Sequence, residues 1–329
     1  MLRVGLIGCG GIGAVHAKAY NTLKDKATLV AIADFNQEKA AEIAKESGSA
    51  VYKDANEMLA KEKLDLVDIC LPTALHAPFV TAALDHVKNV LVEKPVCLTL
   101  DEAEALLQKE KETGGRVHVA HVVRFTTQYA YLKEVMESGR YGKLLAADFH
   151  RISPKPVWVF DYDNPKRTGG MPIDLHIHDV DFIRYLMGGD PDALKATAAT
   201  TKDGIIRQLW TTYHYGDAVI TAEASWDLPV SVPFDRGFRV IFEKASLTLA
   251  AGSELTVYPE EGEPFVPALP ERITMDLGIN VKDFGTFLYE IETFVDAILE
   301  NKPSPVPLCE AVEALRLVQR ELKIARGEV

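Results

Sequence analysis

The amino-acid sequence predicts an α/β fold in which a doubly wound parallel sheet is followed by a second, α+β domain with a mostly antiparallel sheet. Three observations predict it. The chain has 329 residues, and at ~150 residues per domain this length suggests about two domains. Strand and helix patterns alternate through residue 120, and longer alternating segments follow. We therefore expect domains at 1–120 and 121–329.

The first domain is predicted from short apolar runs rich in Val, Ile and Leu, as expected of strands that are buried on both faces. These runs are residues 3–8, 28–34, 65–71, 89–93 and 116–120, with a weaker candidate at 50–52. Segments with helical spacing lie between them. Two of these begin with predicted capping boxes, Asp54-x-x-Glu57 and Thr99-x-x-Glu102. Such alternation gives a parallel sheet with helices on both faces.

The second domain begins with a helical stretch near 126–138, after which the pattern changes. Alternating or nearly alternating segments predict the strands of an antiparallel sheet; they are residues 143–152, 205–215, 217–227 and 237–243. Helices are expected at about 282–300 and 309–325, separated by a Pro-rich turn at 302–307. The apolar stripe of the first of these helices predicts core packing rather than function; it comprises Phe287, Ile291, Phe294, Val295 and Ile298.

The charge balance favours small-molecule partners. The chain has 36 Lys and Arg against 48 Asp and Glu, a net charge of −12, and nucleic acids or anionic membranes require clustered positive charge. Four scattered cysteines form no C-x-x-C pair; they are Cys9, Cys70, Cys97 and Cys309. The N-terminus does not resemble a signal peptide, and no apolar run reaches the ~18 residues of a membrane span. We expect a cytoplasmic protein.

A dinucleotide-binding motif follows the first predicted strand. The residues Gly8-Cys9-Gly10-Gly11-Ile12-Gly13 fit G-x-G-x-x-G between a strand and a helix. Gly8 permits the tight turn, Gly10 lets the backbone approach a pyrophosphate, and Gly13 lets helix and strand pack closely. The helix N-terminus then presents free N–H groups to the phosphates.

Asp34 ends the second predicted strand, 21 residues after Gly13. Its carboxylate can accept hydrogen bonds from both hydroxyls of an adenosine ribose and repels a 2′-phosphate. Because Phe35 and Asn36 supply no cation, NAD is favoured over NADP. FAD is a competing ligand, although no second region for a flavin ring is evident.

Two further stretches carry groups suited to catalysis. Lys94, in Glu93-Lys94-Pro95, follows the fifth predicted strand, where ligands of a doubly wound sheet bind. Asp174 and His178 lie four residues apart in the segment 169–181. In a helix they share a face with Asp181 and Tyr185 and His176 points elsewhere, whereas an extended backbone aligns Asp174, His176 and His178.

With these motifs the chain resembles the Gfo/Idh/MocA family of oxidoreductases. The likeness rests on GCGGIGAVHAKAY at the N-terminus, CLPTALH ending at His76, EKP at 93–95, Arg124-Phe125, the GG…D-x-x-x-H-D stretch, and FVDAILENKPSPV. The resemblance implies a Rossmann domain followed by a domain with a large open antiparallel sheet, often used to form homodimers or homotetramers. It also implies NAD(P)-dependent oxidation or reduction of a sugar or cyclitol. His176 often aligns with glycine in the family, and Val122-Val123 stand where Asn is common.

The resemblance places the family's catalytic residues at Lys94, Asp174 and His178. Oxidation of a secondary alcohol requires a base near the hydroxyl, a role that suits His178. Asp174 can orient the imidazole or bind a neighbouring hydroxyl, and Lys94 can stabilise the substrate oxygen. A metal bound by Asp174, His176, His178 and Asp179 is an alternative, but the short spacing and the family chemistry lead us to expect no metal.

The remaining candidate residues concern binding. Cofactor contacts are expected from the glycine loop with Asp34, Leu71, Pro72, His76, Glu93 and Lys94, with His16 nearby. Substrate contacts are expected from Lys94, Arg124, Trp158, Asp174 and His178; Lys155, Tyr162 and Asp163 are lesser candidates, and Trp158 and Phe160 could instead pack their loop. Two other functions remain open. One is an NAD-dependent glycosidase, and the other a nonenzymatic NAD-binding regulatory protein.

Overall fold

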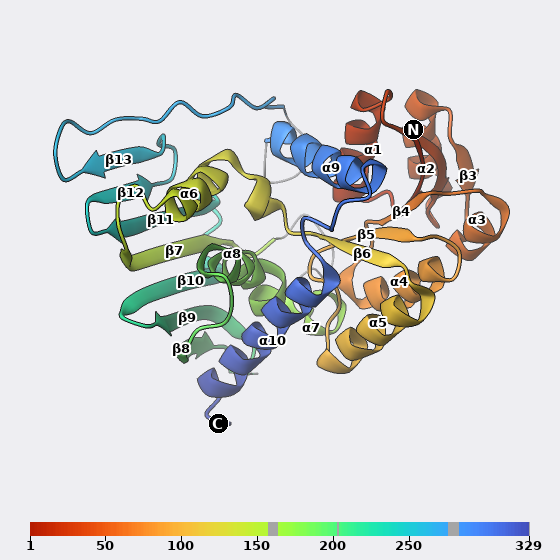
Figure 1. Cartoon of the computed structure of the whole chain (residues 1–329). Coiled ribbons are helices and arrows are strands. Elements are labelled where there is room, and N and C mark those ends of the chain that lie inside the picture. Colours follow the sequence, from red (N-terminus) through yellow and green to blue (C-terminus); the bar gives the residue numbers. More distant parts are fainter. Residues whose placement is uncertain (157–163, 203, 276–282, 329) are drawn as a thin grey trace. The chain divides into compact units, whose positions relative to one another are not determined.

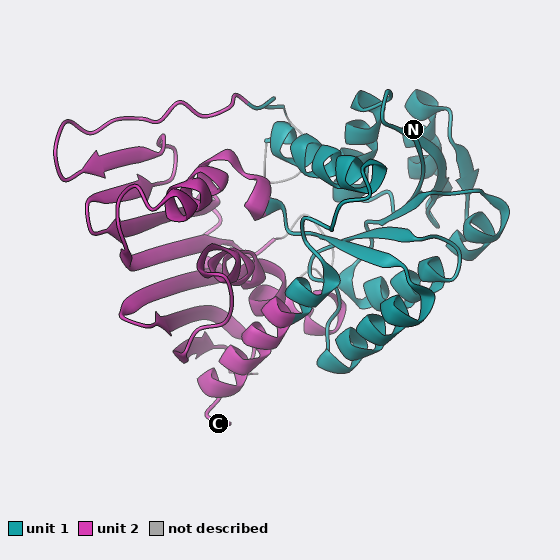
Figure 2. Cartoon of the chain, viewed as in Figure 1, with its two compact units in different colours: residues 1–122, 272–312 teal, residues 123–271, 313–329 magenta. Residues whose placement is uncertain are grey.

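The computed structural model describes residues 1–156, 164–202, 204–275 and 283–328. It divides into two compact units, each made of two chain segments (Figure 2): residues 1–122 with 272–312, and residues 123–271 with 313–329. The predicted boundary at residue 120 lies near the first crossing between units. Residues 272–312, which we expected in the second domain, pack within the first unit.

The first unit contains a parallel sheet of six strands, as the sequence predicts, and the structure gives their order as β3-β2-β1-β4-β5-β6. The strands are β1 (Leu2–Ile7), β2 (Ala27–Ala33), β3 (Ala50–Tyr52), β4 (Leu66–Ile69), β5 (Asn89–Glu93) and β6 (Arg116–Ala120). The chain moves outward from β1 in one direction to β3 and in the other to β6. The strand order therefore reverses between β1 and β4, and ligands bind outside the carboxyl ends of the strands at such a point.

Helices flank this sheet in sequence order (Figure 1). They are α1 (Gly11–Thr22), α2 (Gln37–Ser47), α3 (Ala55–Lys61), the short 3₁₀ helix η1 (Thr73–Leu75), α4 (His76–Leu84), α5 (Leu100–Thr113) and α9 (Phe284–Leu299). The predicted capping box of α5 is present, with Thr99 and Glu102 exchanging side-chain and backbone hydrogen bonds. Asp54 caps α3 through the Asn56 N–H and not through Glu57, so that part of the prediction was wrong.

The helix α9 returns the chain to the first unit and packs against α1. Its predicted apolar stripe is buried as expected: Phe287, Ile291, Phe294, Val295 and Ile298 are each at most 8% exposed. This packing also buries one acidic residue, Glu290. The position of Glu290 becomes important for the site below.

The second unit contains a sheet of seven strands in the order β13-β12-β11-β7-β10-β9-β8. The strands are β7 (Leu144–Pro154), β8 (Ala193–Thr200), β9 (Ile206–Tyr215), β10 (Ala218–Leu228), β11 (Asp235–Phe242), β12 (Ala245–Leu249) and β13 (Thr256–Pro259). Neighbouring strands are antiparallel except for β7 and β10, which are parallel. The sequence predicts β7, β9, β10 and β11, but it gave no prediction for β8, β12 or β13.

Helices cover one face of this sheet. The helical segments from residue 122 to the C-terminus, apart from α9, are η2 (Val122–Phe125), α6 (Thr127–Ser138), α7 (Pro165–Thr168), a π-helical turn η3 (Pro172–His176), α8 (Ile177–Met187) and α10 (Leu308–Ala325), whose end belongs to the second unit. Figure 1 shows α6 and α8 lying across the sheet. Tyr129 of α6 contacts the rings of Phe182 on α8 and Phe238 on β11 edge to face, at centroid distances of 4.8 and 5.1 Å. Aromatic packing of this kind fixes the helix layer on the sheet.

None of the described helices has both the length and the apolar character required to cross a membrane.

Candidate functional site

The glycine loop adopts the geometry that its motif predicts. Gly8 has a φ of +102°, which L side chains rarely adopt. A Cβ on Gly13 would lie 2.0 Å from the Gly8 carbonyl oxygen, so only glycine allows α1 to pack this closely. A Cβ on Gly10 would meet no atom within 4 Å, and the space above this residue is open. The loop therefore offers exposed backbone to a ligand at Gly10 and Gly11.

Asp34 lies beside this loop. Its Oδ2 accepts a hydrogen bond of 2.6 Å from the Cys9 N–H, and its Oδ1 accepts one of 2.7 Å from the Asn36 N–H. Each carboxylate oxygen can accept a further bond, and the side chain is only partly buried. Gly10 caps α1 without a side-chain acceptor, which leaves first-turn N–H groups available to phosphate. Loop, helix terminus and carboxylate thus fit the pyrophosphate and ribose of a dinucleotide.

His76 joins the loop after β4 to the loop after β5. Its Nε2 lies 2.7 Å from the Leu71 carbonyl oxygen and its Nδ1 lies 2.7 Å from that of Pro95. Carbonyl oxygens only accept, so both bonds form together when both ring nitrogens carry a proton. Burial lowers the pKa of His76, and the two carbonyls oppose that effect. The His76 ring thus lies between the backbone of Leu71, which precedes Pro72, and that of Pro95, which follows Lys94 in a cis peptide.

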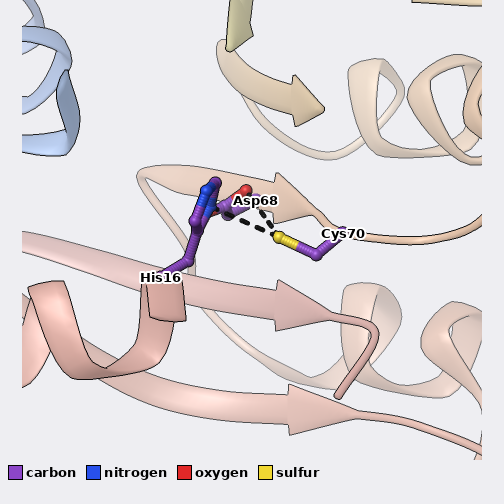
Figure 3. Close-up of side chains that lie close together, drawn as sticks. All are labelled: His16, Asp68 and Cys70. Carbon is purple, nitrogen blue, oxygen red and sulfur yellow. Dashed lines mark hydrogen bonds and ion pairs between the residues drawn. The ribbon is translucent and has the colours of Figure 1, made fainter. Parts of the chain in front are cut away.

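A buried polar cluster lies behind the glycine loop (Figure 3). His16 Nδ1 is 2.9 Å from Asp68 Oδ2 and 3.3 Å from Cys70 Sγ, and its Nε2 is 3.3 Å from Glu93 Oε1. Burial alone would lower the pKa of His16, but Cys70 and Asp68 raise it well above its usual value. The His16 ring thus lies between the carboxyl groups of Asp68 and Glu93. Glu93 is buried, but the pKa of its carboxyl is lowered by His16.

The His16, Asp68 and Cys70 side chains are also the group of potential metal ligands that lies within 4.8 Å among the described residues. Direct hydrogen bonds account for these contacts, because His16 and the Tyr20 hydroxyl both donate to Asp68 at 2.9 Å. Burial raises the pKa of the Cys70 thiol. The cluster thus holds Glu93 through His16. Glu93 in turn accepts a hydrogen bond of 3.0 Å at its Oε2 from the backbone N–H of Lys94.

Glu290 adds a second carboxyl to this region. The side chain is fully buried, and neither oxygen has a hydrogen-bond partner. Burial raises the pKa of Glu290 well above its usual value, and the nearby Glu93 carboxylate raises it further. The neutral form of Glu290 is therefore favoured over its anion more strongly than in an exposed glutamate. Sequence reasoning missed both Glu290 and Asp68, because neither stands in a motif with a recognisable spacing.

The second unit carries Asp174 and His178 on a continuous helical segment. Gly169 and Gly170 have positive φ values of 85° and 70° and lead into the π-helical turn and then α8. Of the two alternatives that the sequence left open, the structure shows the helical one and not the extended backbone. From Met171 through Val180, His178 is the residue that is not buried. The imidazole of His178 is thus the accessible one on this segment.

The neighbouring side chains of the segment point elsewhere, as the helical alternative predicts. His176 Nε2 donates to Glu321 Oε2 at 2.8 Å in the interior of the unit. Asp179 accepts two hydrogen bonds of 2.9 Å from Arg151. Two of the four side chains in the alternative metal site are therefore held in buried pairs.

The predicted substrate residues lie in different surroundings. Arg124 donates to both carboxylate oxygens of Asp181, at 2.8 and 2.7 Å, and its guanidinium carbon is 4.6 Å from the centroid of the Tyr185 ring. Two hydrogen-bond donors of the Arg124 guanidinium are thus already used within the second unit. Lys155 is half-buried. Trp158, Phe160, Tyr162 and Asp163 lie outside the described residues, and their roles remain predictions.

Comparison with family models matches both units. Residues 2–121 match the model described as "Oxidoreductase family, NAD-binding Rossmann fold", and residues 129–248 match the "GFO/IDH/MocA C-terminal domain". Together the matches cover most of the chain. They agree with the glycine loop and Asp34 in the first unit, which fit NAD.

The chain is also similar in sequence to individual oxidoreductases. The chain is 35% identical over 191 residues to scyllo-inositol 2-dehydrogenase (NAD(+)) of Bacillus subtilis, a match that covers 57% of this chain and 55% of the relative. It is 26% identical to UDP-N-acetylglucosamine 3-dehydrogenase of Acidithiobacillus ferrooxidans over 98% of this chain and 96% of that protein.

A solved structure shares the fold along the whole chain. The structure of levoglucosan dehydrogenase in complex with NADH and levoglucosan superposes with a TM-score of 0.86 at 24% identity, covering 100% of this chain and 98% of the other. The motifs of both units, the two family models and this fold lead to one conclusion: the chain belongs to the Gfo/Idh/MocA family of NAD-binding oxidoreductases.

Proposed function

We propose that this protein is an NAD-dependent oxidoreductase acting on a secondary hydroxyl of a sugar, sugar acid or cyclitol. Family membership supports the reaction class. Relatives named for inositol and for a nucleotide-linked amino sugar support polyhydroxylated substrates. The acidic surface charge is compatible with such small molecules.

The first unit supplies the cofactor contacts in this proposal. The loop Gly8, Gly10, Gly11, Ile12 and Gly13 would hold the pyrophosphate, and Asp34 the adenosine ribose. The rest of the dinucleotide would be lined by residues at or just beyond the carboxyl ends of β4 and β5, namely Leu71, Pro72, His76, Glu93 and Lys94. NAD, when bound, supplies the hydride acceptor or donor.

The accessibility of His178 carries the proposal. A proton acceptor must contact the substrate hydroxyl, and His178 is the residue from Met171 through Val180 that is not buried. His178 accepts the hydroxyl proton during oxidation and returns it during reduction. Asp174 orients the imidazole or binds a neighbouring hydroxyl. Lys94 donates a hydrogen bond to the reacting oxygen and stabilises its negative charge.

Substitution of His178 tests this assignment. NADH absorbance is followed with a panel of inositols, aldoses and sugar acids, for the wild-type protein and for His178→Ala. We expect kcat to fall by about 10²–10⁴-fold, because the general base is lost. His86→Ala is the matched control, since His86 is an exposed histidine to which the proposal gives no role. Its kcat should remain within twofold of the wild-type value.

Other results would contradict the proposal in different ways. An unchanged kcat in His178→Ala would remove His178 as the base. Release of an aryl leaving group without net NADH would indicate the glycosidase alternative. NADH binding without turnover of any compound would favour a regulatory protein.

We also propose that the protein forms a homodimer or homotetramer through the outer face of the second unit's sheet. Paired residues cross this face from β13 to β9 in one row: Tyr258, Ser246, Ile241, Ala146, Val219 and His214. Tyr258, Ile241 and Val219 are among the exposed large apolar residues. A cytoplasmic location remains a prediction.

A further inference from the structure

A buried cluster in the second unit joins the segment of the proposed base to the C-terminal helix. The Glu321 carboxylate, on the last turns of α10, accepts three hydrogen bonds. His176 Nε2 and Thr211 Oγ1 donate to Oε2 at 2.8 and 3.2 Å, and the Tyr213 hydroxyl donates to Oε1 at 2.7 Å. His176, Tyr213 and Glu321 are fully buried, and Thr211 is 1% exposed.

Because the cluster is buried, its carboxylate and its donors depend on one another. An ionised carboxylate in the interior is costly unless donors surround it, and here three donors from two elements converge on it. The anion also raises the pKa of Tyr213, after burial, well above its usual value, so the phenol stays a donor. Removing Glu321 would leave the side chains of His176, Thr211 and Tyr213 buried without their acceptor.

His176 transmits this constraint to the proposed site. It is the last residue of the π-helical turn Pro172–His176, and it stands two residues from both Asp174 and His178. A π-helical turn has weaker intrinsic stability than an α-helix and needs support from its surroundings. The imidazole is held at Nε2, and its Nδ1 is buried with no hydrogen-bond partner. The support therefore comes through the bond to Glu321.

We propose that Glu321 is a positioning residue for the reaction. Its bond to His176 fixes the helical phase of the π-turn and so the directions of the Asp174 and His178 side chains. The inference rests on the proposed function, because it assigns those two side chains to catalysis. A shift of about 1 Å in a reacting group can reduce the rate by about a hundredfold.

A double-mutant cycle tests the inference. Glu321→Leu and His176→Leu are each expected to lower kcat at least tenfold and to change KM by less than threefold. The double variant should lose no more than the worse single variant, since both changes break the same bond. Glu321→Gln retains one acceptor oxygen for His176, while the Tyr213 hydroxyl can rotate to accept from the amide. The Glu321→Gln variant should therefore keep most of the wild-type kcat.

Val318→Ala is the control for general destabilisation, because Val318 is a fully buried residue on the same helix without a polar contact to the π-turn. It should lower the melting temperature and leave kcat within twofold. Hydrogen exchange of amides 173–178 gives a readout independent of turnover. Exchange should quicken in Glu321→Leu and His176→Leu but not in Val318→Ala.

The outcomes separate this inference from the proposed function. If Glu321→Leu does not fold, His176→Leu and Glu321→Gln still measure the bond. A folded, active set in which Glu321→Leu and His176→Leu keep the wild-type kcat would overturn the positioning role. Additive losses in the double variant would do the same. A wild-type protein that turns over no substrate would refute the proposed function, and the exchange rates would then still show whether Glu321 anchors the turn.

Discussion

At the scale of single residues, cofactor choice depends on Asp34. Its Oδ2 accepts the Cys9 N–H of the glycine loop and its Oδ1 accepts the Asn36 N–H, so the carboxylate is fixed before any ligand arrives. A fixed anion can accept from ribose hydroxyls and repels a 2′-phosphate. Asp34→Asn removes the charge and keeps one acceptor. We expect NADH affinity to fall roughly tenfold and the preference for NADH over NADPH to shrink at least tenfold.

Fluorescence titration with each nucleotide measures this effect. Glu38→Gln is the control, because Glu38 is an exposed acid in the first turn of the adjacent helix α2. Its two affinities should match those of the wild type. Equal discrimination between NADH and NADPH in Asp34→Asn and in wild type would show that selectivity arises elsewhere.

Glu290 gives a second prediction, which concerns the pH dependence of stability. Burial, reinforced by Glu93, raises the pKa of Glu290 in the folded state. The folded protein therefore binds this proton more tightly than the unfolded chain, in which the pKa is about 4.3. As the pH rises above about 4.3, this tighter proton binding lowers the free energy of unfolding by up to about 1.4 kcal/mol per pH unit. The decrease ends when the pH passes the pKa of Glu290 in the folded state.

Glu290→Gln abolishes this proton binding. Urea unfolding between pH 4 and 8 should give a variant whose stability relative to wild type increases with pH, while the two differ least at pH 4. Glu300→Gln, at the exposed C-terminal end of the same helix, should follow the wild-type curve. A difference between Glu290→Gln and wild type that does not vary with pH would mean that Glu290 is ionised in the folded protein.

At the scale of secondary-structure elements, the buried pair Arg151 and Asp179 joins β7 to α8. Their side chains are 3% and 1% exposed, and the two hydrogen bonds are parallel and bidentate. Asp179→Ala would leave the guanidinium buried without its partner and should cost about 3–5 kcal/mol. The double variant Arg151→Met with Asp179→Leu should recover most of that loss, because apolar side chains of similar size need no counterion.

Chemical denaturation of the three proteins checks this expectation. Asp179 is next to His178 in the sequence, so the substitution could also disturb the proposed base. Activity is therefore measured as well, at a low temperature at which the variants remain folded. If Asp179→Ala and the double variant are equally destabilised, the loss comes from packing rather than from the unpaired charge.

The elements also show which structure could be predicted from the sequence. The β1 strand, the glycine turn and the Thr99 cap are determined by residues close together in the chain, and each was predicted. The strand β8, with the sequence ALKATAAT, lacks the β-branched apolar pattern of a strand, and its pairing with β9 determines its structure. The parallel pairing of β7 with β10 is equally non-local.

The candidate site likewise contains residues that the local sequence predicts and residues that it does not. Gly8, Gly13 and Asp34 were predictable because a motif fixes their spacing. Glu321 lies 145 residues from His176, and Glu290 lies far from Glu93 in the sequence. Contacts of this kind are set by the packing of helices from the C-terminal part of the chain. No local pattern reports them.

At the scale of the whole molecule, the outer face of the seven-stranded sheet is the feature that predicts assembly. Helices cover the opposite face, where Phe149, Val240 and Leu247 are buried. On the outer face, Trp210, Val219, Ile241 and Tyr258 are between 36% and 48% exposed. Stable interfaces bury about 800 Å² per partner around such apolar groups.

We therefore expect an oligomer whose mass depends on this face. Val219→Glu combined with Trp210→Glu places charges that would be buried at an interface, and burying unpaired charge opposes association. Light scattering coupled to size-exclusion chromatography should show a dimer or tetramer for wild type and a monomer for the double variant. Phe35→Glu, which changes an 84% exposed ring in the first unit, should leave the mass unchanged. A monomeric wild type, or an oligomer that survives both substitutions, would show that this sheet face is not the assembly surface.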